Sequence, residues 1–412
     1  MQEQSRGVGH RVGAPLGLVT GGHFFSHLYL LALPPLLPLI VAAFSLSNAT
    51  FGVLVSAVAL GPLFLQIPVG SIVDDRGPKT VLVAGLLVSG LGTALVGVAP
   101  TYPVAVGFAV LAGVGQAAFH PADYAILGSI TSESNEGRAF SIHTFGGYAG
   151  FAAAPIGIGT LGFATSWRFA LVVAGLLGVV YALVVAVALD AAAFVRPGDD
   201  DAEEGRTSGG RVRSMLAGAF HPPVLAMFAF FMVITMGTKA IQTFTTVFIT
   251  DGFGLTADLG NGSLTSFFAS TAVGILVGGV LADRFHPQTV AVSTLTVVAA
   301  TVLAVVAGAV PVTATTVVPL YAILGFFVGV ALPSRDRLVS AFSDPNDVGS
   351  NFGFVFTGLS LGGLLSPVLV GVTIDATSVY VGLLFVAAFY ALAAFVVVTL
   401  ALGVVPTGNR SG

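Results

Sequence analysis

The sequence predicts an all-α membrane protein with twelve transmembrane helices, arranged as two parallel six-helix repeats. Of its 412 residues, 55% are hydrophobic and only 8% are charged, whereas a soluble domain carries about 25% charged residues. Apolar runs of about twenty residues, the length that a helix needs to cross a bilayer, recur along the whole chain. They do not show the alternating ten-residue pattern of an outer-membrane barrel. One long polar stretch divides these runs into two sets of six.

The polar stretch covers residues 190–223 and predicts a solvated linker. An acidic cluster is followed by a basic one, with Gly and Ser between them and few apolar residues to build a core. The predicted domains are therefore an N-terminal six-helix bundle at 1–189, the linker at 190–223 and a C-terminal six-helix bundle at 224–412.

The first apolar run is too long for the hydrophobic region of a cleaved signal peptide, so we interpret it as a membrane span. The expected spans are 16–44, 51–73, 81–98, 103–130, 139–161, 168–189, 224–249, 263–282, 289–309, 316–338, 352–374 and 379–404. Prolines in the first, fourth and tenth spans are expected to break helical hydrogen bonds, which is tolerated where the backbone lines a cavity or is covered by neighbours. They are Pro34, Pro35, Pro38, Pro121 and Pro333.

The distribution of basic residues predicts the orientation. If the amino terminus is cytoplasmic, the lysines and arginines of the loops fall inside and only Arg168 falls in an outer loop. We therefore expect a multi-pass protein of the plasma membrane with both termini and the linker in the cytoplasm.

An internal repeat relates the two halves. Glycines, prolines and an aspartate recur at matching positions of corresponding spans: Gly70 and Gly279, Asp74 and Asp283, Gly113 and Gly325, Pro121 and Pro333, Gly146 and Gly358, Gly150 and Gly362, Pro155 and Pro367. Because each copy has an even number of spans, both enter the membrane from the same side. Such parallel repeats are related by an axis along the membrane normal.

The loop after the second span carries a recognisable motif. Gly70, Asp74, Gly77 and Lys79 fit the pattern G-x-x-x-D-R-x-G followed by a basic residue, although Asp75 takes the place of the arginine and Arg76 comes one residue late. The second copy keeps the D-R pair as Asp283 and Arg284 but has His286 where glycine is expected. With its two halves of six spans, the chain resembles the major facilitator superfamily, and this resemblance implies transport by alternating access.

Two further stretches resemble exporters of that superfamily. The fifth span contains Gly146, Gly150 and Pro155, a series that resembles the antiporter motif of drug-exporting members. Small residues four apart also allow close helix packing whatever the substrate. The segments GHFFSHLYLLALPPLLPL and GVGQAAFHPADYAIL, together with the region around Lys239, resemble the fosmidomycin-resistance subgroup of exporters.

Several polar residues lie deep in the predicted spans, where a charge costs about 2.5 to 3.5 kcal/mol. We expect the substrate to bind to six of them: His23, His27, Gln116, His120, Lys239 and Gln242. Lys239 would be the counter-charge of an anion, and His27 is a candidate proton relay because imidazole changes charge near neutral pH. The alternatives are that the histidines are neutral and bonded to neighbouring groups, that the glutamines only join helices, and that Lys239 extends to the outer interface.

A second group of charges is expected near the cytoplasmic face, as an ion-pair cluster that acts as a gate. The gate and motif residues are Gly70, Asp74, Arg76, Asp123, Arg138, Asp283, Arg284, Arg335, Asp336 and Arg337. His120 and Asp123 share one helix face and are a possible metal-ligating pair, but no second pair from another span is evident in the sequence. No metal site is therefore expected, and the chain has no cysteine.

These features predict a secondary active transporter that exports an anionic drug or metabolite in exchange for protons. Proton-coupled uptake of an organic anion is an alternative, and a polytopic membrane enzyme is a weaker one. The sequence contains no H-E-x-x-H, G-x-S-x-G or G-x-x-x-x-G-K-[ST] motif, which argues against an enzyme and against direct ATP hydrolysis. The expected partners are a small-molecule substrate, protons and the lipid bilayer, with no nucleic acid; the protein is expected to be a monomer without a cofactor, driven by the proton gradient.

Overall fold

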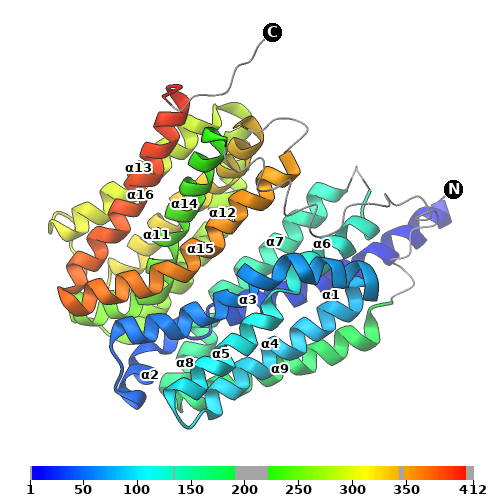
Figure 1. The fold of residues 1–412 in the computed structure, drawn as a ribbon, viewed down its shortest axis with the longest axis horizontal. Helices are drawn as coiled ribbons and strands as arrows, with labels where there is room; N and C mark the ends of the chain where they lie inside the picture. The colour runs from blue at the N-terminus through cyan, green and yellow to red at the C-terminus, as the bar shows by residue number, and fades with distance from the viewer. Residues whose placement is uncertain (1, 133–134, 191–220, 343–347, 405–412) are drawn as a thin grey trace. The chain divides into compact units, whose positions relative to one another are not determined.

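The computed structural model describes residues 2–132, 135–190, 221–342 and 348–404, and these ranges are built from helices joined by short connections (Figure 1). Most of the predicted linker lies outside the described residues. The helices before it are α1 (Gln2–Leu30), η1 (Pro34–Leu36), α2 (Leu37–Phe44), α3 (Asn48–Arg76), α4 (Pro78–Val98), α5 (Tyr102–Gln116), α6 (Phe119–Ile130), α7 (Glu136–Ala153), η2 (Ala154–Gly159), α8 (Thr160–Ala164) and α9 (Trp167–Ala188). The helices after it are α11 (Pro222–Phe253), α12 (Ala257–Arg284), α13 (Pro287–Val306), α14 (Val317–Phe342), α15 (Val348–Ala376) and α16 (Val379–Ala401).

Within the described residues, 12 helical segments are long and apolar enough to cross a membrane. Six precede the central linker and six follow it, which confirms the predicted fold class. Three of these spans are made of more than one helix: α1, η1 and α2 form the first, α5 and α6 the fourth, and α7, η2 and α8 the fifth.

The prolines explain the interrupted spans. In the first span α1 ends at Leu30, and the 3₁₀ turn η1 contains Pro34 and Pro35. In the fourth span the helix is interrupted at Ala117 and Ala118, whose backbone N–H groups bond three residues back instead of four. This break lies four residues before Pro121, where the proline ring would clash with the carbonyl of a regular helix.

Pro333 has no N–H and so removes one helical hydrogen bond, as expected, but α14 continues through it as a single helix. In this region α14 packs against α12. A Cβ on Gly278 of α12 would lie 2.4 Å from the carbonyl oxygen of Val330, so the two backbones are in close contact just before the proline.

The chain forms two compact units. The first comprises Met1–Leu36 and Ala57–Ser208, and the second comprises Leu37–Ser56 and Gly209–Gly412. In the first unit, α4 packs against α5 and α9, and α1 packs against α7 (Figure 1). In the second unit, α11 packs against α15 and α16, α12 against α14, and α13 against α16. The segment 37–56 therefore packs with the second unit, although it precedes the linker in the sequence.

Matched glycines form matched contacts in the two units. A Cβ on Gly113 of α5 would lie 2.4 Å from the carbonyl oxygen of Val58, and one on Gly325 of α14 would lie 2.0 Å from that of Phe267. Real Cβ atoms do not approach so closely, so both positions require glycine. The repeated glycines thus allow the same backbone approach in each copy.

A second pair of glycines fixes the register of the first and fifth spans of each copy. A Cβ on Gly150 of α7 would lie 2.1 Å from the carbonyl oxygen of Phe24, and one on Gly362 of α15 would lie 2.3 Å from that of Met232. Phe24 on α1 and Met232 on α11 are therefore structurally equivalent. This register defines which side chains of the two units occupy corresponding places.

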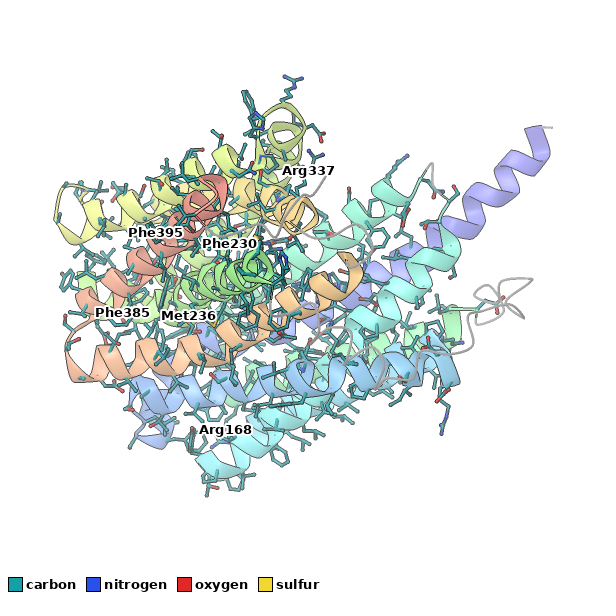
Figure 2. The ribbon with its side chains drawn as sticks, turned by 45° about the horizontal axis from the view of Figure 1, so that its top comes forward. Arg168, Phe230, Met236, Arg337, Phe385 and Phe395 are labelled. Carbon is teal, nitrogen blue, oxygen red and sulfur yellow. The ribbon has the colours of Figure 1, made fainter. Side chains whose placement is uncertain are left out.

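The exterior of the second unit is strongly apolar, as expected of a protein surrounded by lipid. Phe385 and Phe395 on α16 are 39% and 61% exposed, whereas Phe230 and Met236 on α11 are buried (Figure 2). Aromatic side chains on such an outer face are compatible with lipid contact, whereas an apolar patch of this extent is unusual on a soluble monomer.

Candidate functional site

Three buried ionisable side chains meet inside the first unit, and we call them the His–Asp cluster. They are His23 on α1, Asp123 on α6 and His143 on α7. Nδ1 of His23 lies 3.2 Å from Oδ2 of Asp123, and Nε2 of His143 lies 3.5 Å from the same oxygen. Asp123 is fully buried, and the two histidines are at most 5% exposed. The two imidazole rings stack with centroids 3.9 Å apart.

Local helix geometry brings the cluster together. The break between α5 and α6 precedes Asp123, and the glycines of α7 allow α1 to approach closely. Gly147 faces the imidazoles, because a Cβ there would lie 2.7 Å from Cδ2 of His23 and 2.9 Å from Cε1 of His27. A side chain at this position would displace the rings.

Two predicted site histidines lie beside the cluster. The ring of His27 is 4.3 Å from that of His23, and its Nδ1 lies 3.1 Å from the carbonyl oxygen of His23. The ring of His120 is 5.7 Å from that of His23 and 5.6 Å from that of Tyr124, and His120 is exposed. The structure therefore brings His23, His27 and His120 into one neighbourhood.

The structure changes the interpretation of Asp123 and adds His143. Asp123 was expected in an ion-pair cluster with the charges of the tenth span, but its contacts are with histidines of its own unit. The sequence showed no second ligating pair near His120 and Asp123, and the structure supplies one in His23 and His143. His143 has no other histidine near it in its own span that would suggest a site. Only the register that Gly146 and Gly150 impose on α1 and α7 could have shown that it lies next to His23.

Gln116 is held by reciprocal hydrogen bonds rather than facing a solute. Ser26 donates its hydroxyl to Oε1 of Gln116 over 2.8 Å, and Nε2 of Gln116 donates to the carbonyl oxygen of Ser26 over 3.1 Å. Both side chains are buried. This arrangement favours the alternative in which the glutamine joins two helices.

Lys239 lies in the middle of α11 in the second unit. Its side chain is partly buried, and a Cβ on Gly363 of α15 would lie 3.8 Å from its Cε. One turn further along α11, Oε1 of Gln242 is buried and has no hydrogen-bond partner among the described residues. The hydroxyl of Thr238, the residue before Lys239 in the chain, lies 3.0 Å from that of Tyr390 and donates to the carbonyl oxygen of Ile234 over 3.1 Å. This part of the unit therefore combines a cation with polar side chains.

The predicted gate charges form two separate pairs in the second unit. Arg335 contacts Asp336 at 2.8 Å, and its guanidinium lies 4.7 Å from the ring centre of Phe231. Arg337, labelled in Figure 2, pairs with Asp283 of α12. Arg284 is the exposed last residue of α12.

In the first unit, the loop motif lies at the end of α3. Asp74 and Arg76 are exposed, and a Cβ on Gly70 would meet nothing within 4 Å. Gly77 has a φ of 80°, which explains the glycine of the motif. Arg138 is an exposed residue of the first turn of α7.

The antiporter-like series packs helices within the first unit. A Cβ on Gly146 would lie 2.4 Å from Cγ2 of Thr20 on α1, and Gly150 contacts the same helix at Phe24. Pro155 lies in the π-helical segment η2. The structure thus gives the two glycines a packing role.

Sequence reasoning missed one polar contact in the second unit. The carboxylate of Asp375 on α15 accepts hydrogen bonds from the backbone N–H groups of Asn48 and Ala49, at 3.0 and 2.8 Å, and from Nδ2 of Asn48 at 2.9 Å. A carboxylate at a helix N-terminus satisfies unpaired N–H groups and is favoured by the helix dipole. Asp375 therefore caps α3.

Comparisons with known proteins agree with this architecture. Residues 19–265 and 233–411 match the model of the Major Facilitator Superfamily. A chloramphenicol resistance protein of Streptomyces lividans is 26% identical over 344 residues, which cover 83% of this chain and 84% of the relative. The protein named "Probable nitrate/nitrite transporter NarK2" of Mycobacterium tuberculosis strain H37Rv is 29% identical over 342 residues, covering 80% and 81%.

Solved structures share the fold at low sequence identity. A bacterial homologue of the human lysosomal transporter Spinster superposes with a TM-score of 0.78 at 17% identity, covering 94% of this chain and 98% of the other. The nucleoside transporter NupG superposes with the same TM-score at 14% identity, covering 94% and 100%. From the family match, the twelve spans and these structural neighbours, we conclude that the chain belongs to the Major Facilitator Superfamily of membrane transporters.

Proposed function

We propose that the protein is a secondary active transporter that exports a small organic anion in exchange for protons, with Lys239 as the counter-charge of the anion. In this proposal it works as a monomer in the plasma membrane, with both termini in the cytoplasm. Membership of the family indicates a transporter. The direction of transport, the coupling ion and the substrate class are proposed in addition.

The depth of Lys239 carries the proposal. It lies near the middle of Pro222–Phe253, and no other lysine or arginine among the described residues lies so far from both ends of its span. The described acidic residues of the second unit lie near helix ends: Asp251, Asp258, Asp283, Asp336 and Asp375. The middle of this unit is therefore positive, and a cation held at depth favours an anionic ligand.

The polar groups around Lys239 suit recognition of an oxyanion. Lys239 supplies a flexible ammonium with three donors, and the preceding residue, Thr238, has its hydroxyl bonded to that of Tyr390. Gly363 leaves room next to the lysine stem, since a Cβ there would lie in ordinary contact with Cε. A small ligand with one acidic group fits such a site better than a neutral or cationic one.

Export and an anionic substrate are each supported by a different relative. One is named for resistance to chloramphenicol, which agrees with export of a toxic compound. Another is named for nitrate and nitrite, which are anions. The sequence resemblance to fosmidomycin-resistance exporters points to the same combination, because fosmidomycin is an anionic phosphonate.

Ligand-dependent thermal stabilisation of the purified protein tests the substrate class, because a ligand that binds only the folded state raises Tm. Sodium fosmidomycin and sodium nitrate serve as anionic probes and chloramphenicol as a neutral one. We expect an anionic probe to raise the Tm of the wild type, Lys239→Met to abolish that shift, and Lys239→Arg to retain it. If chloramphenicol stabilises the protein and neither anion does, or if Lys239→Met keeps the full anion shift, the assignment is wrong.

Transport in inverted membrane vesicles tests direction and coupling. An exporter should accumulate the anionic probe in the lumen when respiration acidifies it, and an uncoupler should abolish the accumulation. Equal accumulation with and without the uncoupler would contradict proton exchange. Loss of preloaded probe from the lumen on energisation would indicate uptake instead of export.

A further inference from the structure

We propose that the His–Asp cluster is a binding site for one divalent transition-metal ion of the zinc type, with His23, Asp123 and His143 as its protein ligands. This site lies in the first unit and does not depend on the anion site proposed at Lys239. Each of the three ligands comes from a different helix, α1, α6 or α7.

The spacing of the donor atoms fits a metal ion. One donor atom from each residue lies within 4.8 Å of the other two, and the two measured pairs are 3.2 and 3.5 Å apart. Zinc binds imidazole nitrogen and carboxylate oxygen at about 2.0 to 2.1 Å, which places neighbouring ligand atoms of a tetrahedron about 3.3 to 3.4 Å apart. The two distances to Asp123 therefore lie close to the edge of such a tetrahedron, and the third pair, His23 and His143, lies within 4.8 Å.

Unpartnered atoms in the cluster point to a missing occupant. Oδ1 of Asp123 and both ring nitrogens of His143 are buried and have no hydrogen-bond partner among the described residues. Nε2 of His143 faces Asp123 at 3.5 Å without hydrogen-bond geometry. Buried polar atoms are nearly always paired, and a bound ion is one of the few arrangements that explains such exceptions.

Charge balance favours a cation in the same place. Asp123 is fully buried, and an ionised carboxylate inside a protein needs a counter-ion or a metal. The side chains in contact with it are imidazoles, which are neutral when they act as metal ligands. A divalent ion would offset the carboxylate and accept a lone pair from each imidazole.

The donor set indicates which metals fit. Two imidazoles and one carboxylate suit zinc and neighbouring transition metals rather than calcium or magnesium, which prefer oxygen ligands. Three protein ligands leave one position of a tetrahedron open, as in zinc sites that also bind water or a substrate. The rings of His27 and His120 lie 4.3 and 5.7 Å from that of His23.

The second unit makes glycine contacts that match those of the first without metal-ligating residues at the equivalent positions, so the fold itself does not require the His–Asp cluster. From the register of the repeat, His23 corresponds to Phe231, because each precedes an equivalent residue, Phe24 or Met232. Asp123 corresponds to Arg335, each two residues after a matched proline, and His143 to Val355, each three residues before a matched glycine. None of the three equivalents in the second unit is a metal ligand.

Metal binding to the purified, untagged protein tests the proposal after a chelator has been added and removed. Cobalt(II) serves as a spectroscopic probe and zinc chloride as its competitor. We expect one Co²⁺ per chain with the visible absorption of a tetrahedral site, displacement of Co²⁺ by Zn²⁺, and a rise in Tm with Zn²⁺. Asp123→Asn and His143→Ala should weaken metal binding at least tenfold, because each removes a ligand. His286→Ala removes an exposed histidine of the second unit and should leave binding unchanged.

The outcomes separate the alternatives. If the wild type shows neither a Co²⁺ spectrum nor a Zn²⁺-dependent Tm shift, the cluster is a metal-free group of side chains and the proposal is wrong. Unchanged binding in both cluster variants would also overturn it, since the metal would then lie elsewhere. If a variant does not fold, X-ray absorption of the Co²⁺-loaded wild type decides: two imidazoles in the ligand set support the site, and an oxygen-only set contradicts it.

Discussion

In the first unit, Asp123 lies between His23 and His143, whereas in the second unit the equivalent positions hold Arg335, Phe231 and Val355. The surrounding backbone is alike, because matched glycines make matched contacts in both units. The charged residue nevertheless has the opposite sign, and Arg335 is only partly buried, whereas Asp123 is fully buried. The matched glycines thus preserve the backbone contacts of each copy, whereas the side chains that differ between the copies, such as Asp123 and Arg335, give the two units different charged groups.

The largest loss of stability is expected when Asp123 of the first unit is replaced by arginine, the residue at the equivalent position of the second unit. Asp123→Arg would place a guanidinium against two imidazoles in a fully buried place. Leaving a buried charge without its partner costs about 3 to 5 kcal/mol, which is a large part of the stability of a typical protein. We expect little monodisperse protein in size-exclusion chromatography. A yield and Tm close to those of the wild type would show that this pocket tolerates either sign of charge.

The matched glycine contacts should be equally sensitive in both units. Gly150→Ala and Gly362→Ala each place a Cβ within 2.3 Å of a carbonyl oxygen, and such overpacking costs about 1 to 3 kcal/mol. Both variants should lower Tm by similar amounts. Gly107→Ala is the matched control, since its Cβ would meet nothing within 4 Å. A loss of Tm in only one of the two variants would mean that one copy repacks and that the contacts are not equivalent.

Removing the charge from the second unit should be milder than reversing the charge in the first. Arg335→Met loses the contact with Phe231 and the pair with Asp336, whose side chain is 47% exposed. A cation–π contact contributes about 0.5 to 2 kcal/mol, and an exposed ion pair contributes at most about 1. We expect a modest drop in Tm with normal yield. A drop as large as that of Asp123→Arg would contradict the contrast between the two pockets.

The smallest expected effect concerns the cap on α3. Asp375→Ala removes the acceptor for the backbone N–H groups of Asn48 and Ala49, and loss of an N-cap costs about 0.5 to 2 kcal/mol, with exposed sites at the low end. Asp375→Asn keeps one acceptor oxygen and should retain part of the stability. Equal Tm values for Asp375→Ala and the wild type would show that the cap contributes nothing to folding.

Much of the fold could be predicted from the sequence because bilayer thickness and backbone chemistry leave few choices. Long apolar runs indicated the spans, and repeated glycines and prolines indicated two copies. The sequence did not distinguish Pro121, near which the fourth span divides into α5 and α6, from Pro333, through which α14 continues as one helix. The grouping of residues 37–56 with the second unit was also beyond sequence reasoning, because it depends on contacts between distant segments.

The candidate site was predictable in composition but not in its contacts. Depth along a helix follows from counting residues, so Lys239 and the histidines can be selected from the sequence alone. Which side chains meet depends on helix rotation and register. Asp123 was therefore grouped with the arginines at its depth, although it contacts His23 and His143. Gln116 was selected as a ligand, and its hydrogen bonds with Ser26 could not be foreseen from the sequence.

The most direct test of the contrast between the two units is to measure Zn²⁺ and fosmidomycin shifts of Tm side by side on three proteins: the wild type, Asp123→Asn and Lys239→Met. Separate sites predict that Asp123→Asn loses the zinc shift and keeps the fosmidomycin shift, whereas Lys239→Met loses the fosmidomycin shift and keeps the zinc shift. If one variant loses both shifts while its Tm without ligand is unchanged, the two ligands share a single site and the account given for the two units is wrong.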